Sequence, residues 1–136
     1  MSDGRILVTG AAGLIGFTLA ARLHAGGRPV IGMDQVAPAE AHDFPFIAAD
    51  LGDVHKLYQA LDQGVEGIIH CGAVSGPMLL LDNPRSIVQS NIMGSANIFE
   101  AARQRDLRRV VYCSSTSAYG DHPKGLEICT EETALN

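Results

Sequence analysis

Short runs of apolar residues alternate with longer segments of helical periodicity along the chain. The runs contain few polar interruptions, which is typical of strands buried on both faces. Buried strands that alternate with helices indicate a parallel sheet. The strands are expected at residues 5–8, 29–33, 44–48, 67–71 and 109–113.

Two helices are expected in the first half of the chain. In residues 14–25, Ile15, Leu19 and Leu23 recur every four positions before Gly26-Gly27 ends the helix. Asp53 is a suitable N-cap for the second helix, whose apolar stripe consists of Val54, Leu57, Tyr58 and Leu61.

The longest helix is expected to open at Asn83-Pro84 and to end near Arg105, with core contacts at Ile87, Val88, Ile98, Phe99 and Ala102. We expect the tail at 120–136 to be loop. Right-handed crossovers between these elements give an α/β fold of the Rossmann type, a doubly wound parallel sheet of about five strands with helices on both faces. Residues 1–136 are expected to form one domain.

Composition narrows the classes of partner. The net charge is −5, and the arginines cluster only near 103–109, at a helix end, so nucleic acid is not expected. Cys71, Cys113 and Cys129 have no metal-site spacing, and the first two are expected inside buried strands as small apolar residues. We see no signal peptide and no apolar run long enough to span a membrane, so we expect a cytoplasmic protein.

A glycine-rich loop follows the first strand and opens the first helix. It reads Thr9-Gly10-Ala11-Ala12-Gly13-Leu14-Ile15-Gly16. Gly10 permits a tight turn, Gly13 removes a side chain where a pyrophosphate approaches the backbone, and Gly16 allows close packing of helix and strand. The alternative is a turn of small residues that serves packing alone. We expect a dinucleotide at the helix N-terminus, bound by Gly10, Ala12, Gly13, Leu14, Ile15 and Gly16.

Asp34 ends the second strand, about twenty residues after the loop, where a dinucleotide fingerprint places an acidic residue. A carboxylate there accepts from the ribose hydroxyls and repels a 2′-phosphate. No Lys or Arg follows until Lys56, so the pattern favours NAD over NADP. The alternative is a solvated aspartate at a strand end.

Asp50 and Leu51 follow the third strand. At the carboxyl edge of a parallel sheet, Asp50 can accept from the adenine amino group while Leu51 covers the ring. The alternative for Asp50 is a helix N-cap for the segment that begins near Asp53.

Five motifs in order make the chain resemble the N-terminal part of the extended short-chain dehydrogenase/reductases, the NAD-dependent epimerase/dehydratase family. The glycine loop matches the family form. His70-Cys71-Gly72-Ala73 resembles His-x-Ala-Ala, with Gly72 in place of the first Ala. The remaining matches are Asn83-Pro84, Asn91-x-x-Gly94 and Ser114-Ser115-Thr116-Ser117-Ala118-Tyr119-Gly120.

The resemblance implies roles for further residues. Cys71, Gly72 and Ala73 correspond to the lining of the nicotinamide-side ribose. Asn91 corresponds to a residue whose amide satisfies backbone groups or a water near the active site, although without the family match it could equally be a polar residue on an exposed helix. Ser115 corresponds to the Ser/Thr that binds the substrate oxygen, and its alternative is a hydroxyl bonded locally in a loop. We expect His70 to be a histidine at a strand end whose hydrogen bonds are satisfied, and no catalytic role is assigned to it.

One family element has no counterpart in these 136 residues. The family uses a Tyr-x-x-x-Lys acid/base pair, and none of Tyr58, Tyr112 and Tyr119 has a Lys four positions later. We therefore expect a dinucleotide-binding domain that ends before the catalytic helix and the substrate domain. The first hypothesis is an NAD-binding fragment of an oxidoreductase, epimerase or dehydratase that acts on a sugar or nucleotide sugar. The second is a stand-alone NAD-binding sensor or scaffold without turnover. Family members often dimerise through the fourth helix, so a homodimer is an open expectation.

Overall fold

A parallel sheet organises the chain. The computed structural model describes residues 4–76, 82–120 and 129–133, and within them five strands pair in the order β3-β2-β1-β4-β5. Each expected strand is present, with its ends displaced by at most two residues. The α/β fold of the Rossmann type is confirmed. The strands are β1 (Arg5–Thr9), β2 (Val30–Asp34), β3 (Phe46–Ala48), β4 (Val65–His70) and β5 (Arg109–Tyr112).

The strand registers bring the carboxyl ends of several strands together at one edge of the sheet. Thr9 pairs with Met33 on one side and with His70 on the other, and His70 pairs with Tyr112. The chain order reverses between β1 and β4. Segments that leave β1 and β4 therefore separate at the point where open α/β sheets form their ligand crevice.

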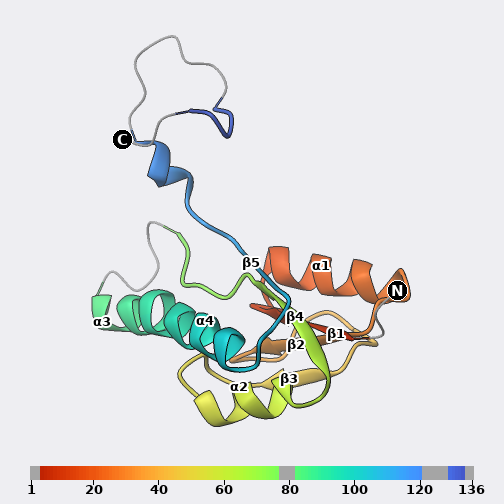
Figure 1. Cartoon of the computed structure of the whole chain (residues 1–136). Helices are drawn as coiled ribbons and strands as arrows, with labels where there is room; N and C mark the ends of the chain where they lie inside the picture. The colour runs from red at the N-terminus through yellow and green to blue at the C-terminus, as the bar shows by residue number, and fades with distance from the viewer. Residues whose placement is uncertain (1–3, 77–81, 121–128, 134–136) are drawn as a thin grey trace.

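Helices cover both faces of the sheet (Figure 1). Helix α1 (Leu14–Ala25) lies on one face, and α2 (Val54–Leu61) lies on the other beside the long helix made of α3 (Pro84–Val88), η1 (Gln89–Gly94) and α4 (Ser95–Gln104). Neighbouring strand residues point to opposite faces. Leu7 and Ile68 accordingly join the core that contains α2 and α4 residues, whereas Val8 packs in the core that contains α1 residues.

The buried face of α1 is made of small residues. Gly16 and Ala20 are the buried residues of this helix, whereas Ile15 is 60% exposed and Leu19 and Leu23 are half-buried. The fourfold spacing therefore predicted the helix correctly but only part of its buried face. The reason is that α1 lies so close to the turn after β1 that Gly16 has no room for a side chain, whereas Phe17 and Leu23 pack at the margin of the core.

The long helix contains a π-helical segment that the periodicity did not predict. It begins at Asn83, whose side chain accepts from the Ser86 N–H, and η1 interrupts the α-helical bonding between Gln89 and Gly94. Ile98 and Ala102 are buried as expected. Val88 and Phe99, expected in the core, are 49% and 42% exposed; Phe99 contacts Tyr112 of the exposed edge strand β5 rather than the core.

The expectation that Cys71 and Cys113 lie inside buried strands is wrong. They directly follow β4 and β5, and Cys71 is half-buried while Cys113 is exposed. Edge strand β5 is also largely uncovered, with Val111 51% exposed. Most of the tail expected as loop lies outside the described residues. Within the described part of the chain, no helix has the length and apolar character needed to cross a membrane.

Candidate functional site

The turn after β1 requires glycine at two positions for reasons internal to the protein. Gly10 has φ +69°, and a Cβ there would lie 2.6 Å from the Cys71 carbonyl carbon. A Cβ on Gly16 would lie 2.1 Å from the Gly10 carbonyl oxygen. Both contacts are with backbone, which cannot move aside without shifting a strand end. The loop is therefore fixed by its own packing.

Gly13 differs from these two glycines. Its φ and ψ of −86° and 165° are ordinary extended values, and a Cβ there would meet only the Gly10 oxygen, at 3.3 Å. Gly13 is also the N-cap of α1 and has no side chain to accept from the first-turn N–H groups. Those groups have no acceptor within the helix, so the loop presents N–H donors beside an uncovered backbone.

Asp34 lies at the end of β2 with its carboxylate held against this loop. Its Oδ2 accepts from the Ala12 N–H at 3.0 Å, and its Oδ1 accepts from the Gln35 N–H at 2.7 Å. An ionised carboxylate has about four acceptor positions. Two hydrogen bonds from backbone N–H groups therefore orient the Asp34 carboxylate, and its remaining acceptor positions are available to a ligand.

Asp50 is linked to the end of β2 through Gln35, a residue that the sequence patterns did not single out. The Gln35 side chain donates from Nε2 to Asp50 Oδ2 at 2.6 Å, and the other carboxylate oxygen accepts from the Gly52 N–H at 2.6 Å. The N-cap of α2 is Asp53, which accepts from the Lys56 N–H. The alternative of Asp50 as the helix cap is therefore wrong.

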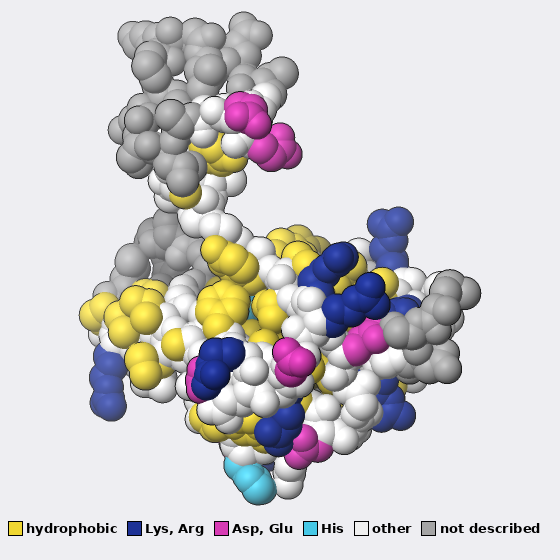
Figure 2. Space-filling model, in the orientation of Figure 1, with side chains coloured by type: hydrophobic (Ala, Val, Ile, Leu, Met, Phe, Trp, Pro, Cys, Tyr) yellow, Lys and Arg dark blue, Asp and Glu magenta, His cyan; other side chains and the backbone are white. Residues whose placement is uncertain are grey.

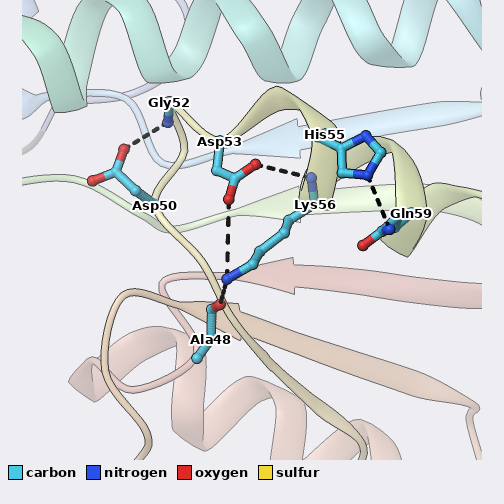
Figure 3. Close-up of polar contacts among 7 residues, drawn as sticks. All are labelled: Ala48, Asp50, Gly52, Asp53, His55, Lys56 and Gln59. Atoms are coloured by element: carbon cyan, nitrogen blue, oxygen red, sulfur yellow. Dashed lines mark hydrogen bonds and ion pairs between the residues drawn. The ribbon is translucent and has the colours of Figure 1, made fainter.

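Lys56 reaches the end of β3 (Figure 3). Its ammonium donates to the Ala48 carbonyl oxygen at 2.9 Å and lies 4.0 Å from the Asp53 carboxylate. Ala48 pairs with Asp34 in the sheet. Lys56 is thus close to the acidic edge despite its distance in sequence, and Asp53 partly compensates its charge.

Two cavities lie along this edge. One of about 210 Å³ is lined by residues of the loop, the β2 end and the β4 end, including Gly10, Gly13, Asp34, Gln35, Leu51, Cys71, Gly72 and Ala73. One of about 550 Å³ is lined by residues that include Ile15, Cys71, Gly72, Ala73, Asn91 and Ser115. The structure therefore brings most expected site residues to two adjoining cavities. Ala12, Leu14, Gly16 and Asp50 are not among the lining residues, and Leu14 is 88% exposed.

A buried histidine connects the loop to the long helix. His70 Nδ1 lies 2.6 Å from Thr9 Oγ1, and its Nε2 lies 3.0 Å from Ser95 Oγ. The Ser95 hydroxyl donates to the Asn91 carbonyl, so it accepts from Nε2–H, and Nδ1 accepts from the Thr9 hydroxyl. Burial lowers the pKa of His70. The expectation of a satisfied strand-end histidine is confirmed.

Asn91 fastens the segment after β4 to the π-helical turn. Its Oδ1 accepts from the Val74 N–H at 2.7 Å, and its Nδ2 donates to the Val74 carbonyl at 2.8 Å. The amide thus satisfies backbone groups, as the resemblance implied. A π-helical turn often marks a functional position, and here it carries Asn91.

Ser115 begins the short 3₁₀ helix η2 (Thr116–Tyr119), which lies away from the sheet (Figure 1). Its hydroxyl oxygen accepts from the Ser117 N–H at 3.1 Å, which is the local bonding that its alternative predicted. Because the oxygen accepts this bond, the hydroxyl proton is still available to a ligand in the larger cavity.

Comparison with known proteins agrees with this geometry. The chain is 36% identical to the UDP-glucose 4-epimerase of Mycolicibacterium smegmatis over 129 residues, 88% of this chain and 41% of that protein. An uncharacterized protein of Methanocaldococcus jannaschii is 38% identical over 91% of this chain and 43% of its own length. The chain thus spans less than half the length of these relatives.

Among solved structures, the UDP-glucose 4-epimerase of Thermus thermophilus in complex with NAD superposes with a TM-score of 0.85. It is 28% identical, and the match covers 97% of this chain and 44% of that one. Residues 6–136 match the NAD dependent epimerase/dehydratase family. The chain therefore belongs to the NAD dependent epimerase/dehydratase family.

Proposed function

We propose that residues 1–136 form one dinucleotide-binding domain that binds NAD along the carboxyl edge of its sheet. The observation that carries this proposal is the placement of Gly13 and Asp34 on one cavity. Packing explains Gly10 and Gly16, whereas Gly13 leaves uncovered backbone where the first-turn N–H groups of α1 face outward. Such a cradle fits a pyrophosphate.

Asp34 selects NAD in this proposal. Its carboxylate, oriented by Ala12 and Gln35, accepts from the adenosine ribose hydroxyls and repels a 2′-phosphate. Asp50 accepts from the adenine amino group, and Leu51 lies under the ring. Gly72 and Ala73 leave room for the nicotinamide-side ribose, beside Cys71 and Asn91.

Calorimetric titration of the chain with NAD and with NADP tests this assignment. We expect NAD to bind more tightly, and Asp34→Ala to weaken NAD binding about tenfold to a hundredfold while narrowing its preference over NADP. Asp43→Ala, at an exposed carboxylate outside both cavity linings, is the matched control and leaves the affinity unchanged. Equal affinity of the native chain for both cofactors contradicts the role of Asp34.

The parent activity that we propose is oxidation, epimerisation or dehydration of a sugar or nucleotide sugar. NAD supplies a hydride acceptor when it is bound. The contribution of this chain is Ser115, whose hydroxyl proton is free to bond the oxygen of a substrate alcohol or ketone in the larger cavity. The names of the epimerase relatives support a nucleotide-sugar substrate.

A stand-alone sensor or scaffold that binds NAD without turnover is the second candidate. None of the three tyrosines starts a Tyr-x-x-x-Lys pair, and the Tyr58 hydroxyl donates to Gln104 outside the cavities. We propose that these 136 residues bind NAD without turnover. An assay of NADH formation with uronates, aldoses and nucleotide sugars tests this, and turnover by the chain itself contradicts it.

We also propose that the chain acts in the cytoplasm. We further propose that two copies of the chain form a dimer through their long helices. Figure 2 shows hydrophobic side chains gathered over the amino-terminal part of this helix and again towards β5. The exposed residues are Val88, Ile92, Met93 and Phe99. Exposed apolar patches of this kind often mark interfaces. Sedimentation of the native chain and of Ile92→Glu distinguishes a dimer through this face from a monomer.

A further inference from the structure

Two cysteines meet where the edge strand pairs with its neighbour. Cys71 follows β4 and Cys113 follows β5. The last paired residues of these strands are His70 and Tyr112, and the Cys113 N–H donates to the His70 carbonyl at 3.0 Å. The parallel pairing thus continues to the cysteines, and their Sγ atoms lie 3.7 Å apart.

The two thiols are chemically unequal. Burial, followed by the neighbouring Cys113 thiol, raises the pKa of Cys71 to about 11, so Cys71 stays protonated at neutral pH. Cys113 is exposed. Both line the larger cavity, and Cys71 also lines the smaller one. A reagent that enters the larger cavity therefore meets an exposed thiol with a second, half-buried thiol beside it.

We propose that Cys71 and Cys113 form a dithiol site that low-molecular-weight disulfides oxidise to an intramolecular disulfide. The Cys113 thiolate attacks one sulfur of the reagent, forms a mixed disulfide and releases one thiolate. Cys71 then loses its proton to solvent and attacks the Cys113 sulfur, and the second thiolate of the reagent leaves. The protein loses two hydrogen atoms, and the reagent disulfide becomes two thiols.

The pairing of β4 with β5 places the two cysteines on neighbouring strands, a spacing that suits this step. Neighbouring strands lie about 4.8 Å apart, within the range of about 4.4–6.8 Å that disulfides span between Cα atoms. Closing the gap between the sulfurs from 3.7 Å to a bond of about 2.05 Å requires rotation of the two side chains. In a reducing compartment the pair rests as two thiols and closes only transiently.

The experiment uses the full chain with Cys129→Ser, which removes the third thiol, and oxidised glutathione as the probe. We expect the intact mass to fall by two hydrogen atoms and peptide mapping to join Cys71 to Cys113. Adding Cys71→Ser stops the reaction at a glutathione adduct on Cys113, and adding Cys113→Ser slows it strongly. Circular dichroism verifies that each variant is folded. A stable adduct on Cys113 when Cys71 is present overturns the proposal.

The dithiol site is also expected to be coupled to the adjoining NAD site, a consequence that rests on the proposed NAD binding. A dinucleotide that covers Cys71 limits closure, so saturating NAD is expected to slow disulfide formation several-fold. By linkage, the closed form binds NAD more weakly by the factor by which NAD disfavours closure. An unchanged rate, with binding verified by calorimetry, overturns this coupling. Absence of NAD binding contradicts the proposed function instead. In that case the glutathione assay without NAD still tests whether Cys71 and Cys113 form a disulfide.

Discussion

The two halves of the sheet edge are built differently. At β1 and β2, backbone contacts hold the loop, and two amide N–H groups orient the Asp34 carboxylate. At β4 and β5, Cys113 and Ser115 are exposed, and η2 lies away from the sheet. The proposed recognition of phosphate and ribose thus depends on backbone that this chain positions by itself, whereas the half that carries Ser115 receives little support from the described residues.

The largest expected effect is a loss of stability in the half of the sheet edge formed by β1 and β2. Gly16→Ala places a Cβ 2.1 Å from the Gly10 carbonyl oxygen, so α1 must move away from β1. We expect the free energy of unfolding to fall by about 3 kcal/mol, at the upper end of overpacking costs. Urea denaturation followed by circular dichroism measures it.

Gly13→Ala is the matched control for this loop. Its Cβ contact of 3.3 Å requires only a small adjustment, and alanine adopts the local φ and ψ, so stability changes by less than about 1 kcal/mol. NAD binding is expected to weaken all the same, because the methyl group lies where the proposed site places the pyrophosphate. Equal destabilisation by the two substitutions contradicts the distinction between packing glycine and ligand glycine.

A smaller effect concerns His70, which joins the two halves. Because burial lowers its pKa below the usual 6.5, the unfolded chain takes up a proton at a higher pH than the folded chain does. The contribution of neutral His70 is thus complete above pH 6.5 and is lost progressively as the pH falls from 6.5 towards the lowered folded-state pKa.

We expect His70→Gln to flatten this part of the pH dependence of unfolding free energy, as measured by urea titrations on both sides of pH 6.5. His55→Gln, at an exposed histidine bonded to Gln59, is the control and retains the native slope. An identical slope in the native chain and His70→Gln refutes the buried neutral state.

The smallest effect on stability is expected at Ser115, in the half of the sheet edge formed by β4 and β5. Because its hydroxyl makes only a local bond to Ser117 and is exposed, Ser115→Ala is expected to change unfolding free energy by less than about 0.5 kcal/mol. NAD affinity should remain that of the native chain in calorimetry. A clear loss of NAD binding instead means that Ser115 contacts the cofactor.

Local patterns predicted the elements because their signals are local. The helix at 14–25 has the predicted bounds, and the helix at 54–61 begins directly after the predicted Asp53 cap. The candidate residues at the sheet edge could be predicted because each lies in the segment that follows a predicted strand. Gly13, Asp34 and Leu51 accordingly line one cavity.

What could not be predicted depends on contacts distant in sequence. Cys113 looked buried because its run is apolar, but β5 is the edge strand and has little cover. Phe99 fits the helical stripe yet turns to Tyr112. The reach of the Gln35 side chain to Asp50 and of Lys56 to Ala48 carries no periodic signal, since it depends on how far loops bring strand ends together.

The pairing of β4 with β1 has a kinetic consequence. Thr9 and His70 are 61 positions apart, whereas β1, α1 and β2 are consecutive. Closing the longer loop costs more chain entropy, so the glycine turn and Asp34 can assemble early and the wall formed by Cys71 and Gly72 joins late. A ligand that needs both sides recognises only the finished edge, and it should therefore prolong the lifetime of the folded chain more than it accelerates folding.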